Sequence, residues 1–253
     1  GLVIYLKSPY QDAIQLHQKG YELGLENGEL ARATLNYCNL LYLKVSQGEN
    51  LKLTQKHSEL AKALTEKKSI FFPEPAIIEK LITSLINASP DGVDILSGAQ
   101  FDAQYLDKMK SGFHYPILNH YRSQLSFWYD EFDSAICFAK QVQDQITLIP
   151  KFSFYIDHLV QYGLLLTSQV NNSNKQPSED LEFCLIKLQA LADLYPQNFE
   201  HKYLLLQAEQ GRYLNEGIER LAPLYEAAIM SARSNSFLQY EALANELYGT
   251  FLL

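Results

Sequence analysis

The stretches Phe199-Glu-His-Lys-Tyr-Leu-Leu-Leu-Gln-Ala-Glu209 and Tyr240-Glu-Ala-Leu-Ala-Asn-Glu-Leu-Tyr-Gly-Thr-Phe251 decide the fold that we expect for this chain. Over residues 199–251, the spacing of apolar residues predicts three consecutive amphipathic helices. Successive helices of this kind, with no catalytic motif between them, are typical of an α-solenoid, which presents a surface. Small residues stand where neighbouring helices would touch, namely Ala208, Ala227, Ala228, Ala232, Ala242 and Ala244. Bulky apolar residues supply the rest of these contacts, namely Leu205, Leu224, Tyr225, Ile229, Leu243 and Leu247.

Helical spacing extends through the rest of the chain. Apolar residues recur at helical intervals from Tyr10 to a stop at Asn27-Gly28, and then again up to Gln47-Gly48. We therefore predict an all-α chain of about eleven helices with no strand. The short connections favour antiparallel neighbours, so we expect a right-handed superhelix (an α-solenoid) of tetratricopeptide-like helix pairs.

The middle of the chain contains one well-defined helix pair. Segments 115–129 and 133–143 are joined by a tight acidic turn, and Ala135 is expected at the close contact between them. Further along, a polar loop is expected over residues 170–177, and Ser178 is expected to start the next helix. A short helix is expected near residues 101–109. We expect one repeat domain over residues 1–253, with a soft break near residues 69–112.

Composition excludes several classes of function. The chain has 253 residues and a formal net charge of −8, so we expect no nucleic-acid partner. The lysines of residues 44–68 are interpreted as a solvated helix face. Three widely separated cysteines, Cys38, Cys137 and Cys184, favour a reducing compartment and buried thiols over disulfides or zinc. No apolar run approaches the ~18 residues of a membrane span, so we expect no membrane insertion and a cytoplasmic location.

Motifs that carry chemistry are absent from the sequence. There is no Gly-Lys dipeptide, hence no P-loop, and there is no His-Arg-Asp or Asp-Phe-Gly motif of a protein kinase. No two histidines have the i, i+4 spacing of a helical metal site. Asp157-His158 lies near Ser153, but the expectation of one shared helix without a nucleophile elbow argues against a triad. We therefore expect no catalytic residue, no cofactor and no metal in this chain.

Three motifs near the C-terminal end resemble a known family. They are Asn198-Phe199-x-His201-Lys202-Tyr203-Leu204-Leu205, Leu224-Tyr225-x-x-Ala228-Ile229-x-x-Ala232 and Glu241-Ala242-Leu243-Ala244-Asn245-Glu246-Leu247. This pattern resembles the tetratricopeptide-like helical domain of large signalling proteins that join a STAND (AAA-type) ATPase to a sensor histidine kinase. Many of these also carry a serine/threonine-kinase-like domain. The resemblance implies a place inside such a polypeptide, and it does not imply that this segment has those activities.

Three functional hypotheses follow from the sequence. The first is a non-catalytic interaction and relay domain of such a signalling protein, with a flanking domain or a signalling protein as its partner. The second is a free-standing scaffold that binds peptides or helices. The third is an all-α enzyme, in which His114, Tyr115, His120 and Tyr121 converge with a distant carboxylate at a cleft. For either binding hypothesis, the aromatic residues expected to line a groove are Tyr121, Phe127, Trp128 and Tyr129.

The C-terminal apolar residues suggest a further contact surface. Leu247, Phe251, Leu252 and Leu253 continue the apolar stripe of the last predicted helix. Terminal solenoid repeats normally carry a polar outer face. We therefore expect the chain to be a piece of a longer protein in which this stripe rests on the next domain. In isolation, the stripe is expected to support a weak homodimer.

Overall fold

The computed structural model describes residues 4–67, 73–87, 108–110, 112, 114–149, 152–168 and 177–253. Within these residues, all regular structure is helical and no strand is present. The predictions of an all-α chain and of about eleven helices are confirmed. The α-helices of the described part are α1 (Tyr10–Glu26), α2 (Leu30–Gln47), α3 (Leu51–Lys67), α4 (Glu74–Asn87), α6 (His114–Trp128), α7 (Phe132–Gln143), α8 (Ser153–Ser168), α9 (Glu179–Leu194), α10 (Pro196–Tyr213), α11 (Ile218–Ser234) and α12 (Leu238–Leu252).

Some predicted features lie outside the described residues. These are nearly all of the short helix at 101–109, the polar loop at 170–176, and the soft break at 69–112 apart from α4 and residues 108–110 and 112. Ser178 is confirmed as the residue that starts α9. Its hydroxyl accepts a hydrogen bond from the Leu181 backbone N–H at 3.2 Å, which satisfies one of the unpaired donors at the helix start.

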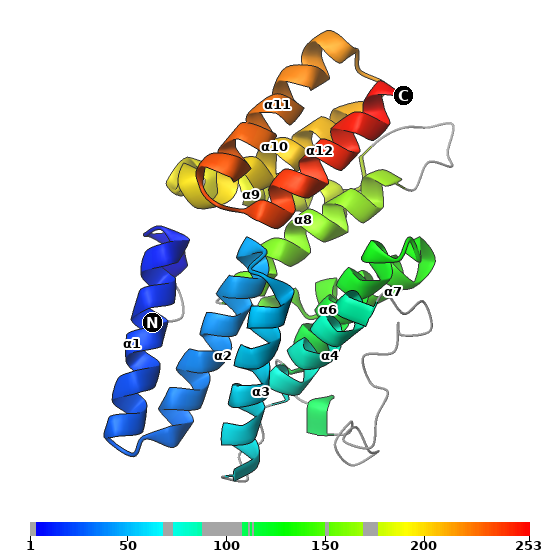
Figure 1. The fold of residues 1–253 in the computed structure, drawn as a ribbon. Coiled ribbons are helices and arrows are strands. Elements are labelled where there is room, and N and C mark those ends of the chain that lie inside the picture. Colours follow the sequence, from blue (N-terminus) through cyan, green and yellow to red (C-terminus); the bar gives the residue numbers. More distant parts are fainter. Residues whose placement is uncertain are drawn as a thin grey trace.

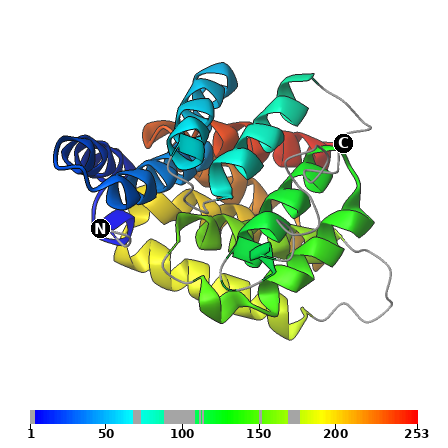
Figure 2. The same cartoon turned by 90° about the horizontal axis from the view of Figure 1, so that it is seen from below.

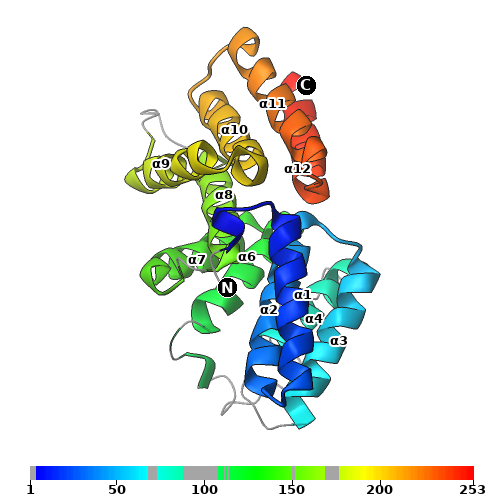
Figure 3. The same ribbon diagram turned by 90° about the vertical axis from the view of Figure 1, so that its left-hand side faces the viewer.

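The helices form two groups joined by α8. In Figure 1, α1–α4 with α6 and α7 occupy the lower part of the molecule, α9–α12 occupy the upper part, and α8 connects them. Figure 3 shows α10–α12 above the antiparallel pair α1 and α2, and Figure 2 shows the two termini at opposite sides. Helix α8 packs against α2, α6, α7, α9 and α10. Thirteen of its sixteen residues are buried, so it is the central helix of the fold.

Four helices end in the same kind of turn. Just after α2, α6, α10 and α11, one residue adopts a left-handed conformation, with φ of 77° at Gly48, 59° at Asp130 and Asn215, and 62° at Ser236. In each case the next backbone N–H donates to the carbonyl five residues earlier, at 2.9–3.0 Å, which is the Schellman pattern. The repeated turn gives these helix pairs the same connection.

A buried asparagine ties the start of the chain to α10. The Asn198 side chain donates to the carbonyls of Tyr5 at 2.6 Å and Ser8 at 2.8 Å, and accepts from the Tyr10 N–H at 3.2 Å. All three of these hydrogen bonds therefore join the amide to backbone groups nearly 200 residues away in the chain. Such a buried polar group stabilises one arrangement over others because leaving its partners unpaired is costly.

A buried ion pair connects α8, α10 and α12. The Lys202 side chain is 0% exposed, and its Nζ donates to Asp157 Oδ1 at 2.6 Å. The Tyr240 hydroxyl donates to the same oxygen at 2.7 Å. Lys202 Nζ also lies 3.4 Å from the hydroxyl of Ser46, near the end of α2. Four helices that are far apart in sequence therefore meet at one charged cluster.

Aromatic rings enclose this lysine. Lys202 Nζ lies 4.5, 5.3 and 5.6 Å from the ring centres of Tyr240, Phe237 and Tyr10. Ring faces attract a cation and thereby offset part of its lost hydration. Burial by itself would raise the pKa of Asp157. The Lys202 ammonium and the hydrogen bonds from Lys202 and Tyr240 outweigh burial and hold that pKa below its ordinary value, so the carboxylate is ionised at neutral pH.

The small-residue and cysteine predictions are mostly confirmed. Ala135 is fully buried between α6 and α7, and its carbonyl accepts from the Ser123 hydroxyl at 2.8 Å. Two predictions are wrong: Ala242 and Cys137 are exposed. Sequence spacing alone predicts a packed face for each, but each lies on the outward side of its helix.

Among the described helices, none has both the length and the apolar character that a membrane-spanning segment needs.

We expect Lys202→Met to destabilise the fold because it leaves the Asp157 carboxylate buried without its cation. The expected loss in the free energy of unfolding is about 3–5 kcal/mol, the range for breaking a buried pair. The double variant Asp157→Asn/Lys202→Met removes both charges and should lose less than the sum of the single variants. Urea unfolding measures all three, and strictly additive losses would contradict the coupling.

We expect Ala135→Leu to cost about 1–3 kcal/mol of stability because the larger side chain overpacks the α6–α7 contact. The matched control is Ala242→Leu, the same change at an exposed helical position, which should alter stability by less than ~0.5 kcal/mol. Thermal unfolding followed by circular dichroism compares them. Equal melting temperatures for the two variants would show that Ala135 is not at a tight contact.

Candidate binding pocket

A pocket of about 680 Å³ opens where four structural elements meet. Its walls come from the α6–α7 turn, the C-terminal ends of α8 and α10, and the C-terminal half of α12. This volume lies in the range of ligand-binding pockets, about 300–1,000 Å³. The apolar part of the lining consists of Phe127, Trp128, Phe132, Leu164, Leu243 and Leu247.

The structure brings together two sets of residues that the sequence predicted separately. Phe127 and Trp128 were predicted for a groove, and Leu247 for a domain interface, yet all three line this one pocket. The Trp128 side chain is 37% exposed, and Phe132 beside it is also exposed. An aromatic side chain that lines a pocket and is also partly exposed to solvent is well placed to bind a partner.

The other two predicted groove residues lie elsewhere. Tyr121 is only 2% exposed and stacks on Tyr42 of α2, with ring centres 6.5 Å apart. The Tyr129 hydroxyl donates to the Ser84 carbonyl of α4 at 2.7 Å. Six residues separate Tyr121 from Phe127, which places them on different faces of α6. Tyr121 and Tyr129 therefore hold α6 against α2 and α4 and do not line the pocket.

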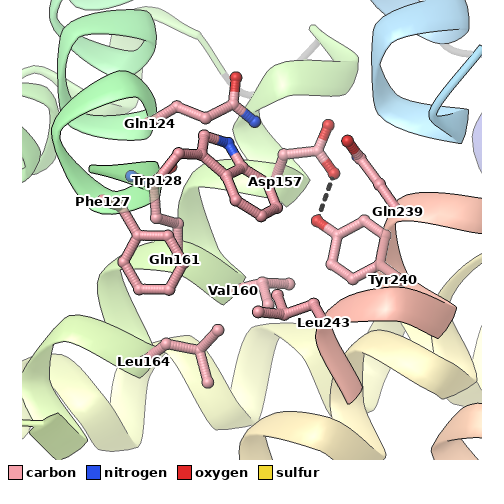
Figure 4. Close-up of a pocket in the computed structure, with 10 residues that line it drawn as sticks. All are labelled: Gln124, Phe127, Trp128, Asp157, Val160, Gln161, Leu164, Gln239, Tyr240 and Leu243. Atoms are coloured by element: carbon pink, nitrogen blue, oxygen red, sulfur yellow. Dashed lines mark hydrogen bonds between the residues drawn. The ribbon is translucent and has the colours of Figure 1, made fainter. Parts of the chain in front are cut away.

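A smaller cavity of about 30 Å³ adjoins the pocket at its inner side (Figure 4). It shares Phe127, Trp128, Leu164 and Leu243 with the pocket. In Figure 4, Asp157, Gln124 and Gln239 stand around one side of this cavity, and the leucines stand around the other. Asp157 and Tyr240 line this smaller cavity, so the buried ion-pair cluster lies beside it and not in the lining of the larger pocket.

The cluster and the pocket are related by a seven-residue spacing on three helices. Asp157 precedes Leu164 by seven residues on α8, Lys202 precedes Glu209 on α10, and Tyr240 precedes Leu247 on α12. Residues seven apart lie on the same helix face two turns apart, a rise of about 10 Å. The cluster fixes these three helices, and it therefore also fixes the residues two turns further along each helix, which line the pocket.

The pocket carries charge that the sequence analysis did not assign. Three carboxylates, Asp130, Glu209 and Glu246, face one guanidinium, Arg212. Glu209 is 7% exposed; it accepts from the Tyr225 hydroxyl at 2.5 Å, and its Oε2 lies 3.5 Å from Arg212 Nη1. Burial raises the pKa of Glu209, although the Tyr225 hydrogen bond and Arg212 oppose this. The Glu209-x-x-Arg212 spacing at a helix end was the signal available in the sequence.

The predicted C-terminal interface is only partly available. Leu247 is half-buried at the pocket wall, and Phe251 stacks on Tyr225 with ring centres 5.7 Å apart. The two residues that follow remain open, since Leu252 is 53% exposed and Leu253 is fully exposed. The apolar stripe is thus packed on its own chain at its start and exposed at its end. The weak homodimer stays a prediction, now limited to Leu252 and Leu253.

The residues of the enzyme hypothesis point to different helices. His114 Nδ1 lies 2.8 Å from Glu74 Oε1 of α4, whereas the Tyr115 hydroxyl donates to Gln141 Oε1 of α7. His120 is buried against Phe154 of α8. The side chains of His114, Tyr115 and His120 therefore contact three different helices. Among the described residues, no group of His, Cys, Asp and Glu is arranged to hold a metal ion.

Comparison of the chain with protein-family models, curated proteins and solved structures finds no significant match.

We expect stability to fall as the pH falls from about 6.5 towards 4. Burial lowers the pKa of five histidines, and the three fully buried ones shift most, to about 4 for His120 and well below the ordinary value for His158 and His201. In the unfolded chain each has a pKa near 6.5, so in this window the unfolded state binds more protons. Each fully shifted histidine then removes up to ~1.4 kcal/mol of stability per pH unit.

Urea unfolding at a series of pH values tests this slope. His120→Gln removes one of the three groups and should flatten the dependence between about pH 6.5 and 4.5 by roughly one proton. A free energy of unfolding that stays constant across this window would show that these histidines are protonated in the folded chain.

Proposed function

We propose that this chain is a non-catalytic protein-binding domain whose pocket takes a segment of a partner protein. The observation that carries the proposal is the pocket between the α6–α7 turn and α12, with the exposed Trp128 and Phe132 at its edge. Aromatic anchors beside a concave apolar surface are the usual centre of a protein-binding site. The buried ion pair between Lys202 and Asp157 lies on two of the helices that form the pocket and supports their relative position.

We further propose that the domain acts as a relay in a signalling polypeptide that joins a STAND ATPase to a histidine kinase. The resemblance of residues 198–247 to that family supports this context. A segment in the pocket would touch α6 and α7 in one group of helices and α10 and α12 in the other. A ligand that contacts both groups biases their relative position if it binds one arrangement more tightly. The rival hypothesis, a free-standing scaffold, would use the same pocket.

The repeated turn supports a finer architectural proposal. Helix pairs joined by the same Schellman connection after α2, α6, α10 and α11 fit a right-handed superhelix of tetratricopeptide-like repeats. In such repeats, a concave face formed by successive helices is the customary binding surface.

We expect peptides selected from a random library on the wild-type chain to change the emission of Trp128, the single tryptophan of the sequence. Leu247→Gln removes an apolar wall of the pocket and should weaken their binding about tenfold, equivalent to ~1.4 kcal/mol. Leu60→Gln makes the same change at an exposed leucine of α3 and should have no effect. Failure to obtain any peptide that depends on Leu247 would contradict the proposed function.

A further inference from the structure

The pocket combines an apolar wall with an excess of negative charge. Of the charged residues that line it in the described part of the chain, three are carboxylates and one is a guanidinium, which leaves a formal charge of −2. Asp130 and Glu246 are exposed at the edge, whereas Glu209 is buried deeper in the wall. The chain as a whole is also acidic, with a net charge of −8. Both the local and the overall field therefore favour a cationic partner and oppose an acidic one.

The buried Glu209 carboxylate accepts a hydrogen bond from Tyr225 and forms a long ion pair with Arg212. Its nearest cation, the Arg212 guanidinium, stands at 3.5 Å, whereas charge-assisted hydrogen bonds of this type measure about 2.7–2.9 Å. A basic group of a ligand could therefore form a closer ion pair with this carboxylate than Arg212 does. Among the described residues that line the pocket, Arg212 is the one that supplies a positive charge.

The lining also suits a helical ligand. On α12 the pocket is lined by Leu243, Glu246, Leu247 and Thr250, which is one helix face over about two turns, or ~10 Å. An amphipathic helix that lies in a groove presents apolar side chains at positions i, i+3 or i+4, and i+7. Such a ligand could contact Trp128 and Leu247 with these side chains and place a flanking basic residue towards Glu209 and Glu246.

We infer that the partner segment is a short amphipathic helix whose apolar face is flanked by lysine or arginine. This inference rests on the proposed protein-binding function and adds the charge of the partner. It is tested with three synthetic peptides of about 14 residues, near the length at which isolated helices form. All three carry leucine at the same i, i+3, i+4 and i+7 positions and contain no tryptophan. The remaining positions carry lysine, glutamine or glutamate.

Titration of each peptide into the wild-type chain is followed by the emission of Trp128. We expect the lysine peptide to bind about tenfold more tightly than the glutamine peptide, and the glutamate peptide not to bind. Added salt should weaken the lysine peptide and leave the glutamine peptide nearly unchanged, since salt screens exposed charges.

Charge-removing variants identify the groups responsible. Asp130→Asn/Glu246→Gln alters only exposed residues, and Glu209→Gln keeps the shape of the buried group. Each should lower the affinity for the lysine peptide several-fold and leave the affinity for the glutamine peptide unchanged. Glu59→Gln removes one exposed carboxylate on α3, outside the pocket, and is the matched control with no expected effect. The exposed double variant keeps the test decisive if Glu209→Gln fails to fold.

The outcomes separate the two levels of the proposal. If the glutamine or glutamate peptide binds as tightly as the lysine peptide, and the binding depends on Leu247, the inferred charge is wrong and the binding function stands. If no peptide changes Trp128 emission and library selection also fails, both are overturned. If the protein self-associates on concentration and this alone changes Trp128 emission, the occupant is a second copy, which also overturns the inference.

Discussion

The buried contact between Lys202 and Asp157 constrains the rest of the structure. Removing an ammonium and a carboxylate from water costs several kcal/mol for each ion, so each is tolerated only because the other is in place. The Tyr240 hydroxyl and the surrounding rings complete the cluster. Since its members come from α8, α10 and α12, these helices have only one relative position in which every charge has its partner. Hydrophobic packing alone would allow small shifts between them.

The candidate pocket depends on this contact through simple helical geometry. Leu164, Glu209 and Leu247 lie two turns beyond Asp157, Lys202 and Tyr240 on the same faces of their helices. The cluster therefore fixes the helices, and the two turns that follow it form three of the walls of the pocket. The α6–α7 turn supplies the remaining wall, with Trp128 at its edge. The shape of the surface pocket thus depends on a polar contact in the core.

Much of the fold could be predicted from the sequence because the positions and ends of its helices depend on local sequence patterns. Apolar spacing located the helices, Gly48 marked the end of α2, and Ser178 marked the start of α9. The left-handed turns at Asp130 and Asn215 carry no glycine, so their conformation gave no comparable signal. Spacing was also insufficient to place Ala242, because one residue along a helix turns the side chain by about 100°.

The site could be predicted only in part because its residues meet through long-range contacts. Phe127 and Leu247 are separated by 120 positions in the chain, and each was assigned a binding role without the other. In the sequence, Lys202 stands out only as one position of a family motif, and that motif does not indicate that the lysine is fully buried. Its partner Asp157, 45 residues earlier, stands out in the sequence only as a candidate member of a catalytic triad. Pairing of this kind depends on which helices become neighbours, and a single sequence does not contain that information.

The central claim is that the cluster of Lys202, Asp157 and Tyr240 holds α12 in place and so builds the pocket. Backbone hydrogen exchange, resolved by segment and compared between wild type and Lys202→Met under native conditions, tests it most directly. We expect residues 238–252 to lose protection strongly in the variant, while α6 and α7 at residues 114–143 retain theirs. An equal loss in both segments, or unchanged protection of α12, would contradict the claim.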